Sequence, residues 1–226
     1  MRTLRRREFF HSKKGVIEFS YLEDPKGLKE FLEELDETTW KYWYRFGKDP
    51  HSTYSNILLS IDKVLFTVGK LKKKIVSLAY LDKIDKDKRI CRFGIVVHPA
   101  FRGLKIGTSH TKFILKVAKD LNLEKVLLSV DTKNEPAFKL YKKLGWKIVK
   151  FFEDNPTRCE MELNLKEEEN SLFSFENRIN YYLSTTHFKL SKLNWNFLHS
   201  YKPWAIDPVR PEWVDKILKK YPKVIK

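Results

Sequence analysis

Two glycines stand in a predicted turn between an apolar run and an amphipathic stretch, in the segment Val97-His98-Pro99-Ala100-Phe101-Arg102-Gly103-Leu104-Lys105-Ile106-Gly107-Thr108. The pattern predicts a strand that leads through a turn directly into a helix, so that backbone N–H groups and the positive end of the helix dipole meet at one spot. Such a spot suits a phosphate or pyrophosphate, because glycine lets a ligand approach the backbone closely. The same pattern also occurs as a plain tight connection, so this segment alone leaves both interpretations open.

A second segment could also contribute to a site, and it reads Asp131-Thr132-Lys133-Asn134-Glu135-Pro136-Ala137-Phe138-Lys139-Leu140-Tyr141-Lys142-Lys143-Leu144-Gly145-Trp146. It predicts the end of a strand, a helix capped by Asn134 and a proline in the first helical turn. Tyr141 follows about two turns along the helix. Its hydroxyl is a candidate functional group, and the alternative is a capped helix whose tyrosine packs in the core.

Periodicity along the chain predicts the elements that position these segments. We expect strands at 15–20, 64–68, 75–81, 90–97, 126–130, 146–152 and 159–165. We expect helices from Pro25, from the capping region 36–39, at 106–121 and at 135–144, and an amphipathic stretch at 54–61. The charged stretches 70–74 and 82–88 are typical of hairpin turns. This order predicts an α/β protein with a mixed sheet and helices on both faces.

Together the two segments resemble the GCN5-related N-acetyltransferase (GNAT) family, and the predicted order of elements matches that fold over residues 15–165. The second segment is similar to the family signature Asn-x-x-Ala-x-x-Leu-Tyr-x-x-x-Gly-aromatic, filled here by Asn134, Ala137, Leu140, Tyr141, Gly145 and Trp146. The first is similar to the family's Val-His-Pro-x-aromatic-Arg-Gly lead into a pyrophosphate loop. The resemblance implies the GNAT acyl-CoA N-acyltransferase fold, with a mostly antiparallel sheet whose central strands are splayed.

The resemblance also implies acetyl-CoA as cosubstrate, bound in the gap between the splayed strands. The backbone of Ile95, Val96 and Val97 would pair with the pantetheine and polarise the thioester carbonyl. Asn134 and Ala137 would help to hold the cofactor. Tyr141 would protonate the departing thiolate as general acid, with a packing or cofactor-contact role as its alternative. The pyrophosphate would lie on Arg102, Gly103, Leu104, Lys105, Ile106, Gly107 and Thr108.

Two positions depart from the family pattern. Lys105 stands where the pyrophosphate loop usually has a glycine, and we expect the loop to tolerate it. The strand at 90–97 contains no carboxylate to deprotonate the acceptor amine, and Cys91 stands near the expected place. A water chain, a backbone carbonyl, His98 or an acid from the acceptor side must then do this work, unless the amine arrives neutral. We expect His98 to be a turn residue before Pro99.

The implied reaction is direct attack of a primary amine on the thioester, with a protein N-terminus or lysine, a polyamine or an amino sugar as candidate acceptor. The alternative hypothesis is a catalytically degenerate GNAT that binds CoA or nucleic acid.

One cluster of acidic residues lies in the helical region that would border the acceptor pocket: Glu30, Glu33, Glu34, Asp36 and Glu37. It either attracts a cationic amine or forms a solvated helix face with i,i+4 pairs, which we favour. For the aromatic cluster 40–46 we favour core packing over stacking on an acceptor.

Composition and charge limit the class of protein, its compartment and its partners. The 226 residues are 42% hydrophobic, enough for a sizeable core, and carry a net charge of +16 that suggests an anionic partner. The apolar runs are too short for a membrane span, and two separated cysteines predict neither a disulfide framework nor a zinc site. We therefore expect a cytoplasmic protein without a metal.

Residues 1–165 form the predicted GNAT domain, and residues 166–226 form a predicted linker and a C-terminal aromatic and basic extension. We expect that extension to pack on the domain or in a homodimer rather than to bind nucleic acid.

Overall fold

The computed structural model describes residues 6–166, so the predicted extension beyond them lies outside the described part of the chain. The helices in this part are α1 (Leu28–Glu33), α2 (Glu37–Tyr42), α3 (Pro50–Ser60), α4 (Ile106–Asp120) and α5 (Glu135–Lys143), with a 3₁₀ turn at Pro99–Phe101. The strands are β1 (Glu8–Ser12), β2 (Gly15–Tyr21), β3 (Leu65–Leu71), β4 (Lys74–Asp85), β5 (Ile90–Val97), β6 (Lys125–Asp131), β7 (Lys147–Phe152) and β8 (Asn155–Asn164). None of these helices is both long and apolar enough to cross a membrane.

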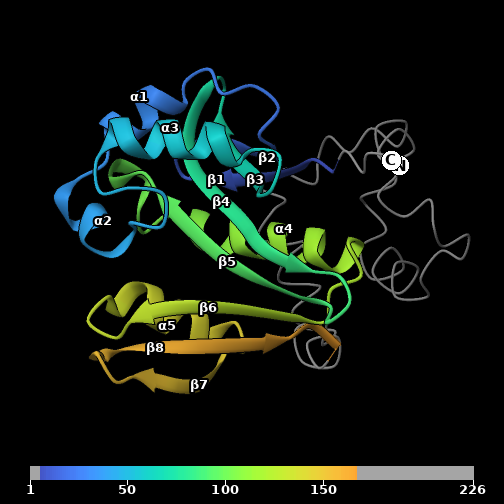
Figure 1. Ribbon diagram of the computed structural model, residues 1–226. Helices are drawn as coiled ribbons and strands as arrows, with labels where there is room; N and C mark the ends of the chain where they lie inside the picture. Colours follow the sequence, from blue (N-terminus) through green and yellow to red (C-terminus); the bar gives the residue numbers. More distant parts are fainter. Residues whose placement is uncertain (1–5, 167–226) are drawn as a thin grey trace, which may run out of the picture. The chain divides into compact units, whose positions relative to one another are not determined.

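The strands form one sheet in the order β1-β2-β3-β4-β5-β6-β8-β7. Every neighbouring pair is antiparallel except β5 and β6, which run parallel. Their pairing begins at Ile90 with Lys125 and ends at Arg92 with Leu127, after which the two strands diverge. Figure 1 shows the opening between them. The predicted fold class, a mixed and mostly antiparallel sheet with splayed central strands, is thus confirmed.

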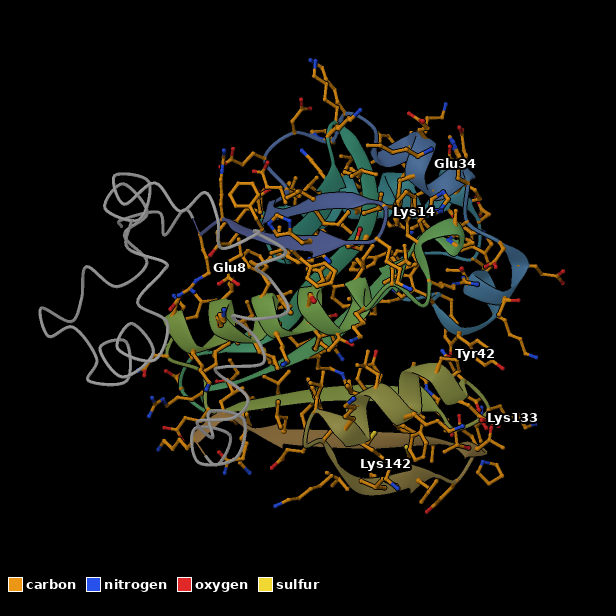
Figure 2. All side chains as sticks on the ribbon, turned by 180° about the vertical axis from the view of Figure 1, so that it is seen from behind. Glu8, Lys14, Glu34, Tyr42, Lys133 and Lys142 are labelled. Carbon is orange, nitrogen blue, oxygen red and sulfur yellow. The ribbon has the colours of Figure 1, made fainter. Side chains whose placement is uncertain are left out.

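The sheet is covered on both faces. In Figure 1 α4 and α5 lie behind it and α1 and α3 in front, and Figure 2 gives the same arrangement from the other side. Alternate residues of β6 and β8, such as Leu128 and Met161, face one large core with Tyr141 of α5. Leu78 and Tyr80 of β4 face a separate core with α1 and α3. Because strand side chains alternate between faces, the opening between β5 and β6 joins two chemically different sides of the sheet.

Three local features differ from the prediction. Strand β1 was not predicted, because the adjacent Phe9 and Phe10 hide the alternation that its pairing with β2 imposes. Helix α3 begins at Pro50 behind an Asp49 cap, four residues before the predicted amphipathic stretch. Strand β4 continues to Asp85, so the start of the predicted 82–88 turn is a buried strand residue, Asp82.

A fully buried histidine ties α4 to the sheet. His110 Nε2 lies 3.0 Å from the Thr67 hydroxyl and Nδ1 lies 2.8 Å from the Ser77 hydroxyl, while the ring stacks on Phe19. A neutral imidazole has one donor and one acceptor nitrogen, and hydroxyls can complement either. Burial lowers the pKa of His110 to about 3, so the ring stays neutral at physiological pH.

The buried His110 predicts a pH-dependent stability. Between the unfolded value of 6.5 and the folded value of about 3, the unfolded chain binds a proton that the folded chain does not, so the free energy of unfolding falls as pH falls. From about pH 7.5 to 5.5 we expect His110 to contribute a loss of about 1.4 kcal/mol in urea unfolding. His110→Gln should flatten this dependence, whereas His11→Gln at an exposed site should not. Parallel curves for the wild type and His110→Gln would contradict the assignment.

Candidate active site

A cavity of about 920 Å³ lies at the opening between β5 and β6. Tyr42 of α2 and Lys133, in the turn before α5, both line it and are labelled in Figure 2. It brings together all but one of the residues predicted to bind the cofactor: Ile95, Val96, Val97, Arg102, Gly103, Lys105, Ile106, Gly107, Thr108, Asn134, Ala137 and Tyr141. The exception is Leu104, which packs against the core cluster of Phe101 and Ile106.

The start of α4 presents unused backbone donors to this cavity. Its cap residue, Lys105, makes no side-chain cap hydrogen bond, and the first N–H groups of any α-helix have no partner within the helix. A Cβ added to Gly103 would meet nothing within 4 Å, and one added to Gly107 would make only ordinary contacts. Packing therefore does not require glycine at these positions, and their backbone is open to a ligand. The site fits an anionic group such as a pyrophosphate.

Lys105 takes the place of the family's glycine by adopting the backbone conformation that glycine favours. Its φ is 62°, in the left-handed region, and the preceding Gly103 has a φ of 72°. A residue with a side chain pays a modest conformational cost there. The loop thus keeps the backbone shape that glycine would give it, and Lys105 adds a basic residue to the cavity lining.

The Arg102 side chain connects the loop to α2. Its guanidinium donates to both carboxylate oxygens of Asp36 at 2.7 and 2.8 Å, and to the Thr39 hydroxyl at 2.5 Å. Asp36 also caps α2 through the Thr39 N–H at 2.8 Å. The Arg102 guanidinium, with help from Thr39, holds the pKa of Asp36 well below its usual range. We call Arg102, Asp36 and Thr39 the clasp, and it fixes one wall of the cavity against the other.

Helix α5 contributes the opposite wall. Asn134 lines the cavity at the helix start but makes no side-chain cap hydrogen bond, so that part of the prediction is wrong. One of the donors that a cap would satisfy is missing, because Pro136 in the first turn has no N–H. Tyr141 is 7% exposed and packs edge-on against Phe93. Burial raises the pKa of its hydroxyl, which therefore stays protonated.

None of the acidic residues of α1 and α2 lines the cavity, although Asp36 bonds two residues that do. Glu33 pairs with Lys29, and Glu34 bonds Lys74 at 2.7 Å and His98 at 2.7 Å. His98 is the turn residue that we expected, since its Nδ1 accepts the Ala100 N–H at 3.1 Å. Glu33 thus forms an i,i+4 pair of the kind that we favoured, whereas Glu34 and Asp36 bond residues outside the helices.

The aromatic cluster at 40–46 divides between the two roles. Phe46 is buried in the core beneath α1 and α3, as expected. Tyr42, Trp43 and Tyr44 line the cavity, and Trp43 also contacts the core. The cluster thus contributes side chains both to the core and to the wall of the cavity.

Sequence reasoning missed the charged groups at the inner end of the opening. Arg92, at the last paired position of β5, donates to the Ser129 hydroxyl and to Glu160, both at 2.6 Å. Asp82 stands opposite Arg92 in the sheet and bonds Arg45 Nε at 2.6 Å. The signal that could have revealed Asp82 is the continued alternation of Leu78, Tyr80 and Asp82, which the charged run of 82–88 obscured.

Cys91, near the place expected for a carboxylate, packs in the core. It is 1% exposed, and burial, followed by the charge of Asp82, raises the pKa of its thiol to about 12. It stays a neutral thiol and does not line the cavity.

The fold is that of the GNAT N-acyltransferases, and sequence comparison agrees. The profile of the acetyltransferase (GNAT) family matches residues 30–146. The chain belongs to this family and is an N-acetyltransferase.

Named relatives differ in their acceptors. Spermidine N(1)-acetyltransferase of Escherichia coli K12 is 24% identical over 127 residues, which are 52% of this chain and 67% of that protein. An N-alpha-acetyltransferase of Sulfurisphaera tokodaii is 46% identical over 57 residues, only 25% of this chain and 34% of the relative. Mycobacterium smegmatis RimJ, solved with CoA-disulfide, superposes with a TM-score of 0.63 at 13% identity, covering 79% of this chain and 94% of RimJ.

The clasp predicts a measurable coupling between Arg102 and Asp36. Asp36→Asn keeps a capping oxygen but removes the charge, and Arg102→Met removes the guanidinium. In a double-mutant cycle by urea unfolding we expect a coupling of about 1 kcal/mol at low salt, because the pair is bidentate yet partly exposed. The exposed pair of Glu135 and Lys139 on α5 is the control, and we expect its coupling to be smaller because solvent screens both charges. Equal couplings would contradict a special role for the clasp.

Proposed function

We propose that this protein transfers an acetyl group from acetyl-CoA directly to a primary amine bound in the cavity between β5 and β6. The observation that supports this most is the uncapped start of α4, with Gly103 and Gly107 open to the same cavity as Tyr141. One end of the cavity thus suits a pyrophosphate, and another presents a protonated hydroxyl. That combination suits a thioester of a phosphorylated carrier.

We assign cofactor binding to the walls on the side of α4 and α5. Backbone N–H groups from Gly103 to Thr108 would hold the pyrophosphate, and Asn134 and Ala137 would border the pantetheine. Beyond Arg92 the backbone of β5 no longer pairs with β6, so Ile95 to Val97 offer backbone groups to a ligand. An N–H there would stabilise the oxyanion that develops on the thioester carbonyl.

Tyr141 is the proposed general acid. A thiolate leaving group needs a proton, and a hydroxyl whose pKa is raised by burial keeps its proton at the pH of the reaction. The Tyr141 ring is held by Phe93 and Trp146, so the hydroxyl has a fixed place in the cavity wall. A transferred proton can return from solvent through the same opening.

Binding of CoA tests the proposal first. We expect calorimetry on the full chain to detect CoA and acetyl-CoA, with an affinity that falls as salt is added. Lys105→Gly should weaken binding about two- to fivefold through loss of one exposed charge, and should not lower the melting temperature because glycine accepts the left-handed backbone. Lys72→Gly, at another left-handed position that does not line the cavity, is the matched control. Absence of CoA binding at millimolar concentration would overturn the proposed function.

Tyr141→Phe tests the chemical step. We expect kcat to fall about 100-fold while the dissociation constant of acetyl-CoA stays within about threefold, because the hydroxyl acts on the leaving group rather than on binding. Tyr54→Phe, a partly buried residue that does not line the cavity, is the control. Turnover of Tyr141→Phe equal to the wild type across pH would show that the hydroxyl is not the acid.

A further inference from the structure

Tyr80 of β4 carries its hydroxyl group across the neighbouring strand to the opening. In the pairing of β4 with β5, Tyr80 stands opposite Gly94. A Cβ added to Gly94 would collide with the hydroxyl oxygen, Cζ and Cε1 of Tyr80. The far end of the phenol therefore lies over the backbone of β5. Gly94 follows the last position at which β5 pairs with β6, so the hydroxyl lies at the strand that borders the opening.

Packing holds the Tyr80 ring in this position. The ring of Phe46 meets it edge-on with centroids 4.9 Å apart, and the ring of Phe66 lies at 6.2 Å. Gly94 is not among the glycines with a positive φ, so its backbone conformation does not require glycine. The phenol requires it instead, because a larger side chain at this position would occupy the place of the ring.

The Tyr80 hydroxyl is open to the cavity. Tyr80 lines the cavity and is 7% exposed, and its hydroxyl makes no hydrogen bond to residues 6–166. The unpartnered side-chain polar atoms of these residues that are closed off from solvent belong to Trp43, Thr53, Asp82 and Trp146. The Tyr80 oxygen is not one of them. A largely buried tyrosine hydroxyl usually has a partner, and here a molecule in the cavity can provide it.

The hydroxyls of Tyr80 and Tyr141 belong to opposite faces of the sheet. Tyr80 packs in the core with α1 and α3, and Tyr141 packs in the core with α5. Both residues line the cavity, and a charge on Tyr141 acts on the pKa of Tyr80. We assigned the cofactor to the walls on the side of α4 and α5. An amine that approaches the thioester from the other face would therefore meet the Tyr80 hydroxyl.

The charges around Tyr80 keep its hydroxyl protonated. Burial, followed by the charge of Asp82 and more weakly that of Tyr141, raises the pKa of Tyr80. Arg45 and Arg92 act in the opposite direction without offsetting this rise. A neutral phenol can donate one hydrogen bond and accept others on its oxygen. It can therefore accept an amine N–H and pass on a proton, but it is not ionised before the reaction.

We propose that Tyr80 is a second catalytic tyrosine, whose oxygen accepts a hydrogen bond from the attacking amine and relays the proton that the nitrogen loses. This inference rests on the proposed function and adds a residue to the same site. It gives the proton a route in a site whose strand β5 carries no carboxylate. Tyr141 acts on the leaving thiolate from the other face, so each hydroxyl serves one end of the reaction.

The proton transfers balance without a further reactant. The amine arrives neutral, and its lone pair forms the bond to the acetyl carbon. The nitrogen then gives one proton to the Tyr80 oxygen while the Tyr80 hydroxyl proton passes to water. The carbon–sulfur bond breaks with its electrons on sulfur, which takes a proton from Tyr141. Solvent returns one proton to Tyr141, which equals the proton that left through Tyr80.

Tyr80→Phe tests the hydroxyl while it keeps the ring. Transfer from acetyl-CoA to propylamine, spermidine and alaninamide is measured by release of the CoA thiol, and the best amine of the wild type is used. We expect kcat/KM to fall at least about tenfold, the worth of one good hydrogen bond, and the dissociation constant of CoA to stay within about twofold. The melting temperature should not fall, because the hydroxyl has no protein partner to lose. Tyr54→Phe, in the same core but not in the cavity lining, is the control.

Gly94→Ala tests the position of the phenol. The added methyl group collides with the ring, so we expect a lower melting temperature and a kcat/KM at least as low as that of Tyr80→Phe. Tyr80→Leu removes the atoms with which the methyl group collides. In that background Gly94→Ala should cost less in melting temperature and should change kcat/KM by less than about twofold. Equal losses in both backgrounds would show that the Tyr80 ring does not reach Gly94, which would overturn the inference.

The pH profile distinguishes a relay from a base. Because the amine loses its first proton in solution, the rise of kcat/KM with pH should follow the pKa of the amine in both the wild type and Tyr80→Phe. A rise that moves to another pH in Tyr80→Phe, or a Tyr80→Phe variant as active as the wild type, would overturn this inference while the transferase function stands. A wild-type chain that binds no CoA would instead contradict the proposed function itself.

Discussion

The divergence of β5 from β6 is the constraint on which the rest of the structure depends. Beyond Arg92 and Leu127 the two strands stop exchanging hydrogen bonds, and their backbone groups must find other partners. Arg92 holds the last paired position by reaching Ser129 on β6 and Glu160 on β8, so the strands stay joined where the opening begins. The sheet thus stays continuous at the paired end of β5 and β6 and opens at the other end. The opening connects the two faces of the sheet and leaves backbone N–H and C=O groups without a partner strand.

The walls of such an opening must be held from both sides. Tyr141, Phe93 and Trp146 pack on the apolar side, while on the other side the clasp joins the loop before α4 to the start of α2. Lys74 and His98 bond Glu34 at the end of α1, which fixes the same helical region to β4 and β5. The acidic residues of α1 and α2 that might have attracted an amine therefore contribute to the position of the wall. The charged residues that line the cavity belong instead to the strands, to the segment after α2 and to the turns before α4 and α5.

Sequence patterns predicted most of this fold because its helices and strands carry strong periodicity. The segments around Gly103 and Asn134 also indicated the walls to which we assign the cofactor, since glycine in a turn and a helix start are local features. The acceptor side could not be predicted in the same way. Asp82 lies in a charged run that is typical of a turn, and only its pairing opposite Arg92 makes it a buried group. Trp43 is one of several adjacent aromatic residues, and nothing local shows that its N–H lacks a partner.

An unpartnered buried group does not by itself mark a site. Thr53 Oγ1 and the indole N–H of Trp146 are also buried without partners, yet neither residue lines the cavity. Each such group costs free energy that an apolar side chain of similar volume would not, so some local reason must maintain it. For Trp146 the large ring itself fills the core beside Phe93 and Tyr141, and that packing outweighs one unused donor. A carboxylate has no comparable apolar contribution. Asp82 bonds Arg45 through one oxygen only, so this ion pair is the interaction that offsets the cost of burying its charge.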